Sequence, residues 1–124
     1  MRRKYMAQEI TVDVILCNAF SVNMLPSNGS TVRFTPVGNP EGVILENVLV
    51  ANAIGHPDTD EVVRTLLEQG GVAGIPVGMR MNVSPLQPGQ ALLVAQYKGP
   101  RLPEGATKLP EGATIEWWLV ELVG

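Results

Sequence analysis

The chain has 124 residues, of which 45% are hydrophobic and 17% are charged, and its formal net charge is −3 at pH 7. This length fits one domain with a single core and is too short for two separately stable halves. The acidic balance argues against a surface that holds long DNA or RNA through phosphate contacts, and no stretch approaches the ~20 continuous apolar residues that would span a bilayer.

The first ten residues are expected to lie outside the folded domain. Met1–Lys4 has the basic character of a signal-peptide start, but Glu9 and Asp13 interrupt the apolar segment that such a peptide needs. We therefore expect residues 1–10 to form a flexible extension and residues 11–124 to form the domain.

The few cysteines and histidines of the chain limit its chemistry. Cys17 is the single cysteine, so an intrachain disulfide is excluded, and its apolar setting predicts a buried thiol in the reducing cytoplasm, that of the host cell if the protein is viral. One histidine and one cysteine make no zinc-ligand set, and the carboxylates are too scattered for a magnesium site. We expect any catalysis to need neither a metal nor another cofactor.

Two strands are predicted to open the domain. Thr11–Cys17 alternates apolar and polar residues and is rich in β-branched side chains, and Thr31–Val37 repeats this pattern. Between them, Asn28-Gly29 predicts a turn.

Two helices are predicted in the middle of the chain. Pro40 begins a segment whose apolar residues fall near one helical face, namely Val43, Ile44, Val48 and Val50. Pro57–Gln69 combines an acidic first turn with an apolar stripe, and Gly70-Gly71 ends the pattern.

Three further strands are predicted at Met79–Ser84, Ala91–Tyr97 and Ile115–Val123. The expected fold is therefore α/β or α+β, with a mixed sheet of about five strands flanked by two or more helices. The last strand has large apolar side chains on both faces, with Trp117 on one face and Trp118 on the other. Either a second subunit covers one of these faces, or both are covered within one subunit.

His56 is the one histidine of the chain and stands in Asn52-Ala53-Ile54-Gly55-His56-Pro57, directly before the second predicted helix. Backbone N–H groups in the first turn of a helix lack internal partners and attract anions such as phosphate. A histidine beside a bound phosphate can transfer a proton near neutral pH. The alternative is a histidine that only caps the helix or fills a gap.

A perfect tandem repeat precedes the last predicted strand. Residues 102–107 and 109–114 both read Leu-Pro-Glu-Gly-Ala-Thr and are separated by Lys108. Proline and glycine in each copy predict consecutive turns, and two copies do not make a solenoid. A local duplication that lengthens a loop is the favoured interpretation.

Three segments together resemble one protein family: Asn18-Ala19-Phe20-Ser21-Val22-Asn23-Met24-Leu25, Ala53-Ile54-Gly55-His56 and Arg101-Leu102-Pro103-Glu104-Gly105. In order and context they are similar to the small viral ring nucleases that act as anti-CRISPR proteins against type III CRISPR immunity. The resemblance covers roughly residues 11 to 124. It implies binding and cleavage of cyclic tetra-adenylate, the second messenger of type III CRISPR defence, which would leave the effector nucleases switched off.

The resemblance also implies roles for single residues. It points to His56 as the general acid and to Glu104 as the carboxylate that favours the imidazolium form. Arg101 would anchor phosphate through two parallel hydrogen bonds, although an exposed ion pair with Glu104 is the simpler interpretation of this pair. Ser21 would offer its hydroxyl or backbone N–H to the substrate, or would only cap the turn.

Further substrate-binding candidates are less sharply defined. Asn18 and Asn23 would hold the loop after the first strand or contact adenine. Gly55 belongs to the segment with His56, and Arg80 falls where the family tends to carry an arginine.

The resemblance also implies a homodimer, because relatives in this family form homodimers. A two-fold dimer suits a ring of four identical nucleotides. Two other functions fit the same motifs. One is a sponge that binds a cyclic oligonucleotide without cutting it. The other is a viral regulatory protein that binds double-stranded nucleic acid, against which the acidic charge counts.

Overall fold

The computed structural model describes residues 3–5, 8–10, 12–18, 20, 24–26, 29–53, 57–75, 86–103 and 106–123. The elements within these ranges follow one another as β1 (Arg3–Tyr5), β2 (Gln8–Ile10), β3 (Asp13–Cys17), β4 (Thr31–Pro36), α1 (Pro40–Glu46), β5 (Val48–Ala53), α2 (Pro57–Gln69), β6 (Gln90–Lys98) and β7 (Thr114–Val123).

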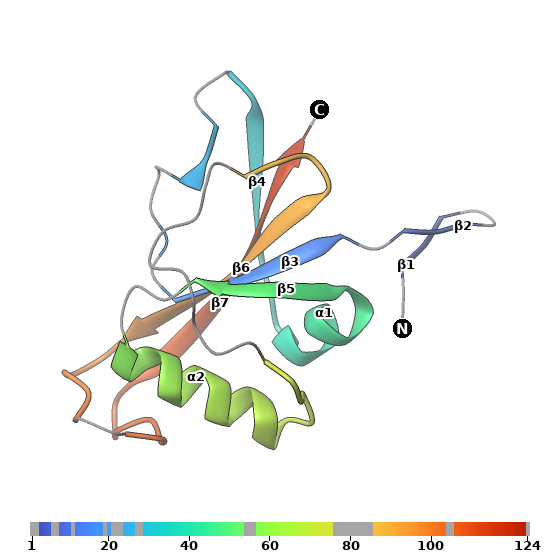
Figure 1. Cartoon of the computed structure of the whole chain (residues 1–124). Helices are drawn as coiled ribbons and strands as arrows, with labels where there is room; N and C mark the ends of the chain where they lie inside the picture. The colour runs from blue at the N-terminus through green and yellow to red at the C-terminus, as the bar shows by residue number, and fades with distance from the viewer. Residues whose placement is uncertain are drawn as a thin grey trace.

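Five of these strands form one mixed sheet in the order β4-β7-β6-β3-β5 (Figure 1). The central strand β3 runs parallel to both of its neighbours, β5 and β6, whereas β7 runs antiparallel to β6 and to β4. The chain is thus a single α+β domain with a mixed five-stranded sheet and two helices, as the sequence predicts.

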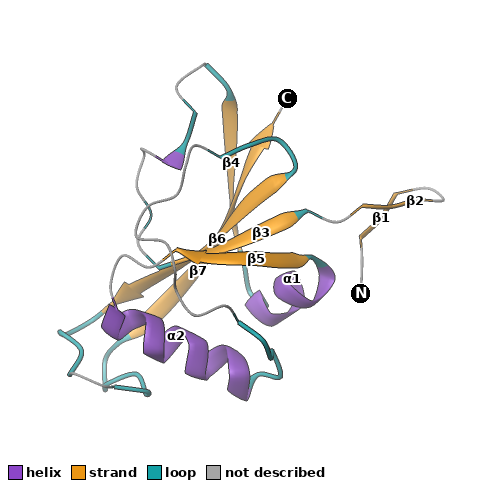
Figure 2. Ribbon diagram, in the orientation of Figure 1, coloured by secondary structure: helices purple, strands orange, loops and turns teal. Residues whose placement is uncertain are grey.

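Both helices lie on the same face of the sheet (Figure 2). Ile44 of α1 and Val63 and Leu67 of α2 pack against inward-facing residues of β3 and β6, such as Leu16 and Leu93. Removing these side chains from water is the main stabilising contribution on this face, and it also fixes where α2 begins.

The opposite face of the sheet carries a second core, which neither α1 nor α2 covers. The segment between β3 and β4 contributes Phe20, Met24 and Leu25, which pack over this second core. Met24 is buried there beside Cys17, whose thiol lies 3.8 Å from the Met24 sulfur, so the predicted buried thiol is confirmed. Trp118 joins this face and Trp117 joins the helix-covered face, as the alternation of the last strand predicts.

The first predicted helix extends too far in the sequence-based interpretation. α1 ends at Glu46, and Val48 and Val50 belong to strand β5. The side chain of Asn47 explains the boundary, because its amide donates to the Val43 carbonyl at 2.8 Å and its oxygen accepts from the Val12 N–H at 3.1 Å. These bonds stop the helix and direct the chain into a strand beside β3.

The other elements agree with the sequence to within a few residues. Helix α2 has the predicted bounds, and β3, β4, β6 and β7 fall on four predicted strands. The fifth predicted strand, Met79–Ser84, lies outside the described residues. Within the expected extension of residues 1–10, β1 and β2 pair antiparallel, and the sequence did not predict this pairing. Neither helix of the described chain has the length and apolar character that crossing a membrane would require.

Candidate functional site

The three segments that carry the family resemblance follow three neighbouring strands, β5, β3 and β6, which run parallel to one another. We call the end of the sheet where these three strands finish the carboxyl end (Figure 1). Cys17, the last residue of β3, pairs with Ala53, the last residue of β5. Asn18 therefore emerges beside the short connection that contains His56.

Helix α2 starts at the same end, because Pro57 is the residue directly after His56. Proline is well tolerated in the first helical turn, since its missing N–H would have no partner there. The N–H groups of a first helical turn have no partner within the helix, and such groups attract anions. The sequence prediction of a helix start beside the histidine is confirmed for α2.

The first turn of α2 also carries negative charge, from Asp58 and Asp60. Asp60 is 5% exposed, and Arg64 donates from Nε to its carboxylate at 3.0 Å and from a terminal nitrogen to Glu61 at 2.7 Å. The hydrogen bond with Asp60 raises the pKa of Arg64 above its ordinary value. One of the two acidic groups at the helix start is thus neutralised by Arg64, which lowers the repulsion that an approaching phosphate would meet.

The third segment leaves the sheet further out. Val94 of β6 lies opposite Cys17, and β6 continues to Lys98, which places the end of β6 ~13 Å beyond the end of β3 at the usual rise per residue. Arg101 follows and is exposed, whereas the next residue, Leu102, is only 7% exposed. The loop therefore turns Leu102 into the protein and leaves the Arg101 side chain in solvent, where it can bind an anion.

Asn18 is buried, with 5% of its surface exposed. Of the two roles expected for it, holding the loop after β3 fits this burial better than direct contact with an adenine. Six other predicted site residues lie outside the described part of the chain: Ser21, Asn23, Gly55, His56, Arg80 and Glu104. Five of the six, all except Arg80, belong to segments that follow the ends of β3, β5 and β6.

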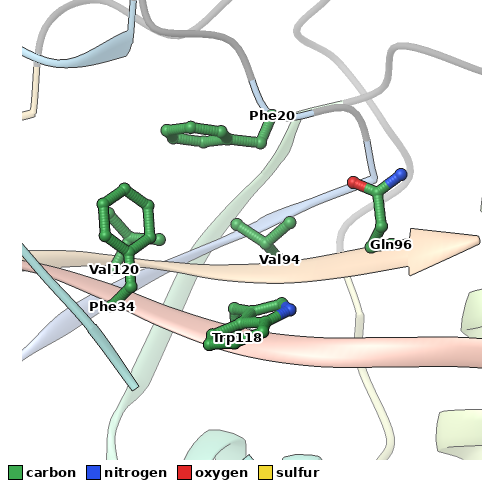
Figure 3. A pocket seen from close by; sticks show the side chains of 6 residues that line it. All are labelled: Phe20, Phe34, Val94, Gln96, Trp118 and Val120. Carbon is green, nitrogen blue, oxygen red and sulfur yellow. The ribbon is translucent and has the colours of Figure 1, made fainter. Parts of the chain in front are cut away.

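A pocket that the sequence did not predict lies on the face of the sheet opposite α1 and α2. Its volume is about 280 Å³, and it is lined by Phe20, Phe34, Val94, Gln96, Trp118 and Val120 (Figure 3). The rings of Phe20 and Phe34 meet edge to face, with centroids 5.8 Å apart and an interplanar angle of 89°. No charged side chain is among the six, so the pocket suits apolar or aromatic groups and not a phosphate.

Residues far apart in sequence line this pocket, so no local motif indicates it. Phe34 is 48% exposed although it is a large aromatic residue. The available sequence signal was the position of Phe34 between Val32 and Pro36 on one strand face, and of Trp118 two residues before Val120 on another. Across the described residues, no three histidine, cysteine, aspartate or glutamate side chains gather in a way that could hold a metal ion.

Comparison with known proteins adds one finding. No family model matches the sequence, and no curated protein matches it. Among solved structures, the chain is similar to B116 of Sulfolobus turreted icosahedral virus, with a TM-score of 0.64 and 27% sequence identity. The match covers 88% of this chain and 98% of that one.

The protein thus resembles a small archaeal viral protein. The likeness extends over nearly the whole length of B116, so it concerns the complete domain and not a single supersecondary motif. This finding agrees with the viral character that the sequence resemblance implies.

Proposed function

We propose that the protein is a metal-independent ring nuclease that binds and cleaves cyclic tetra-adenylate and so acts as an anti-CRISPR protein against type III immunity. One observation carries the proposal: the three segments that resemble the ring nucleases follow the adjacent strands β5, β3 and β6 at a single end of the sheet. Ligands of sheets with parallel strands commonly bind outside the carboxyl ends of those strands. The overall likeness to a viral protein supports the same conclusion.

The chemistry requires little from the protein. A 2′-hydroxyl of the ring attacks the adjacent phosphorus, the O2′–P bond forms, and the P–O5′ bond breaks. The hydroxyl proton passes to solvent, and the departing O5′ receives a proton from the enzyme. Each cut leaves a 2′,3′-cyclic phosphate and a 5′-hydroxyl, and two opposite cuts give two linear di-adenylates. The substrate supplies its own nucleophile. The enzyme therefore has to align the attacking and leaving oxygens, neutralise the charge that develops on the phosphate and protonate the departing O5′.

In this proposal His56 donates the proton to O5′, a role worth ~10²–10⁴-fold in rate. Arg101 binds a phosphate oxygen pair and neutralises the charge of the transition state. Glu104 holds the imidazolium form of His56, which the positive end of α2 would otherwise disfavour. Ser21 and the N–H groups at the start of α2 complete the phosphate contacts.

The proposal includes a homodimer acting in the cytoplasm of the host cell. A two-fold dimer presents two equivalent sites to a ring of four identical nucleotides, so that opposite linkages meet the same residues. The half-exposed Phe34, on the face of the sheet opposite α1 and α2, contributes apolar surface that a second copy would cover. Light scattering on the purified protein measures the stoichiometry, and Phe34→Ser is expected to shift it toward the monomer.

The central test is incubation of the protein with cyclic tetra-adenylate in EDTA, with products separated by chromatography. Wild-type protein is expected to form linear di-adenylate that ends in a cyclic phosphate, whereas His56→Ala is expected to form none at the same concentration. The matched control is Arg33→Ala. It removes a positive charge from the opposite end of the sheet, where Arg33 pairs with Glu121 at 3.3 Å.

Two results would contradict the proposal. An intact ring that co-elutes with the wild-type protein would identify a sponge that does not cut. A ring that neither binds nor changes would limit the resemblance to the fold. A salt-sensitive shift of plain duplex DNA would then favour the regulatory protein.

A further inference from the structure

The tandem repeat includes the residue before each copy. Arg101–Thr107 and Lys108–Thr114 are identical at six of seven positions and differ only in the first residue, which is a cation in both. Each unit therefore places a cation three residues before a glutamate, as Arg101 before Glu104 and Lys108 before Glu111. The second unit thus repeats the cation that we propose binds phosphate and the glutamate that we propose stabilises the imidazolium form of His56.

The two units also share a local structure where both are described. The Ala106 N–H donates to the Pro103 carbonyl at 3.2 Å, and the Ala113 N–H donates to the Pro110 carbonyl at 3.0 Å. In the second unit Gly112 has φ +83°, which a type II turn requires at its third residue.

The orientation of the units relative to solvent agrees as well. Arg101 and Lys108 are exposed, whereas the leucines that follow them, Leu102 and Leu109, are buried and half-buried. Each leucine thus anchors its unit to the protein and directs the preceding cation outward. A loop duplication that served only as a spacer would not need to keep this orientation.

The second unit is fixed against the base of the loop. A Cβ atom on Gly99 would lie 2.6 Å from the Ala113 Cβ, so the two backbones are in close contact, and Gly99 has a φ of +154° that favours glycine. Arg101 comes two residues after Gly99, and Glu111 comes two residues before Ala113. Arg101 and Glu111 thus flank a single contact, beside the end of β6, and Glu111 is exposed there.

We propose that Lys108 and Glu111 form a second ligand-contacting unit of the same site, which duplicates the functions of Arg101 and Glu104. This inference rests on the proposed function. Lys108 adds a positive charge for a second phosphate of the ring, as a point charge without the two-pronged geometry of arginine. Glu111 provides a second carboxylate that stabilises the imidazolium form of His56, so neither glutamate alone is essential.

The test compares turnover of cyclic tetra-adenylate by Glu104→Gln, Glu111→Gln and the double variant. Each single change is expected to lower turnover by less than ~10-fold, and the double change by more than ~100-fold, because the loss of interchangeable groups is not additive. Glutamine preserves the shape of the glutamate side chain, and melting curves test whether the variants fold.

A binding measurement isolates Lys108 from the chemistry. In protein that carries His56→Ala, which leaves the ring intact, Lys108→Ala is expected to raise the Kd for cyclic tetra-adenylate by ~3–10-fold, as the loss of a charged phosphate contact predicts. Arg33→Ala in the same background is the matched loss of one positive charge and is expected to leave the Kd unchanged.

A shortened chain supplies an independent check. Deletion of Lys108–Thr114 joins Thr107 to Ile115 and restores the same residue at the start of β7. This variant keeps Arg101 and Glu104 and is expected to bind as weakly as Lys108→Ala.

The inference is overturned if Glu104→Gln alone is as inactive as the double variant while Glu111→Gln and Lys108→Ala match the wild type. Failure of the proposed function looks different, since the wild-type protein itself would then neither cleave nor bind the ring.

Discussion

The two ends of the five-stranded sheet are built differently. At the amino end, where β3, β5 and β6 begin, hydrogen bonds hold the starts of the strands to neighbouring residues. Asn47 is the single residue between α1 and β5 and bonds to Val43 and Val12, and the Asp13 N–H donates to the Gly89 carbonyl at 3.0 Å. At the carboxyl end, the connection of residues 99–113 between β6 and β7 carries exposed charged side chains.

This difference separates stability from function. Backbone and side-chain groups that are hydrogen-bonded at the strand starts stabilise the fold and are not available to a ligand. Longer loops held by a fixed sheet can present charges to a substrate without carrying the core. The predictions below change one end at a time and ask whether activity and stability respond separately.

The largest expected effect lies at the carboxyl end and concerns turnover alone. Replacing His56 by alanine is expected to lower the cleavage rate by ~10²–10⁴-fold, because the leaving oxygen loses its proton donor. Thermal unfolding and the affinity for the ring are expected to change little. A histidine that only caps α2 would give the reverse result, with a lower melting temperature and an unchanged rate.

The second effect tests whether the loop at the carboxyl end depends on its base. Gly99→Ala places a methyl group against Ala113, and the neighbour includes backbone, which cannot rotate away. Overpacking of this kind costs about 1–3 kcal/mol. We expect lower stability in urea unfolding together with weaker binding of the ring. The control is Gly71→Ala, where the glycine also has a positive φ but an added Cβ meets no neighbour within 4 Å.

Equal losses of stability in the two glycine variants, with binding unchanged in both, would show that the contact with Ala113 does not support the site. The cost would then come from the backbone conformation of glycine alone.

Local sequence patterns predicted the elements whose bounds depend only on residues close to them in the chain. The acidic first turn, the apolar stripe and the paired glycines that follow the helix define α2 locally, and alternation defines β6 and β7. The end of α1 was missed because it depends on the Val12 N–H, which is 35 positions away from Asn47 in the chain. Helical spacing of valines could not reveal that a strand partner was available.

The candidate site was predicted as a set of segments, and the sheet order adds their arrangement. Nothing local indicates that β3 lies between β5 and β6. This order places Asn18 beside the end of β5 and places the Arg101 segment after the strand on the other side of β3. The aromatic pocket was missed for the same reason, because Phe34 and Trp118 come together through strand pairing and Phe20 through the crossing segment. Sequence reasoning thus finds chemistry-bearing residues more readily than the surfaces that pairing creates.

The third effect lies at the amino end and concerns stability alone. Asn47→Ala removes the acceptor of the Val12 N–H and the donor to the Val43 carbonyl, both in a half-buried setting. A buried polar group without a hydrogen-bond partner lowers the free energy of unfolding by about 1–3 kcal/mol, so a clear fall in the urea midpoint is expected. Turnover per folded molecule should equal that of the wild type. Reduced turnover at full folding would show that the two ends are coupled.

The smallest expected effect comes from the ion pair at the amino end. Arg33 and Glu121 meet at 3.3 Å on neighbouring strands, but the Arg33 side chain is 60% exposed, so solvent screens most of the attraction. Exposed pairs contribute about 0–1 kcal/mol, and Arg33→Ala should therefore change stability by no more than this. Its effect on ring binding should be nil, because Glu121 pairs with Ala91 at the start of β6, at the far end of the strand from the Arg101 loop. If Arg33→Ala weakens binding as much as Arg101→Ala does, the ligand responds to net charge, and the contrast between the two ends is wrong. High salt decides between these outcomes, since a long-range effect of net charge fades with ionic strength while a direct phosphate contact at Arg101 persists in part.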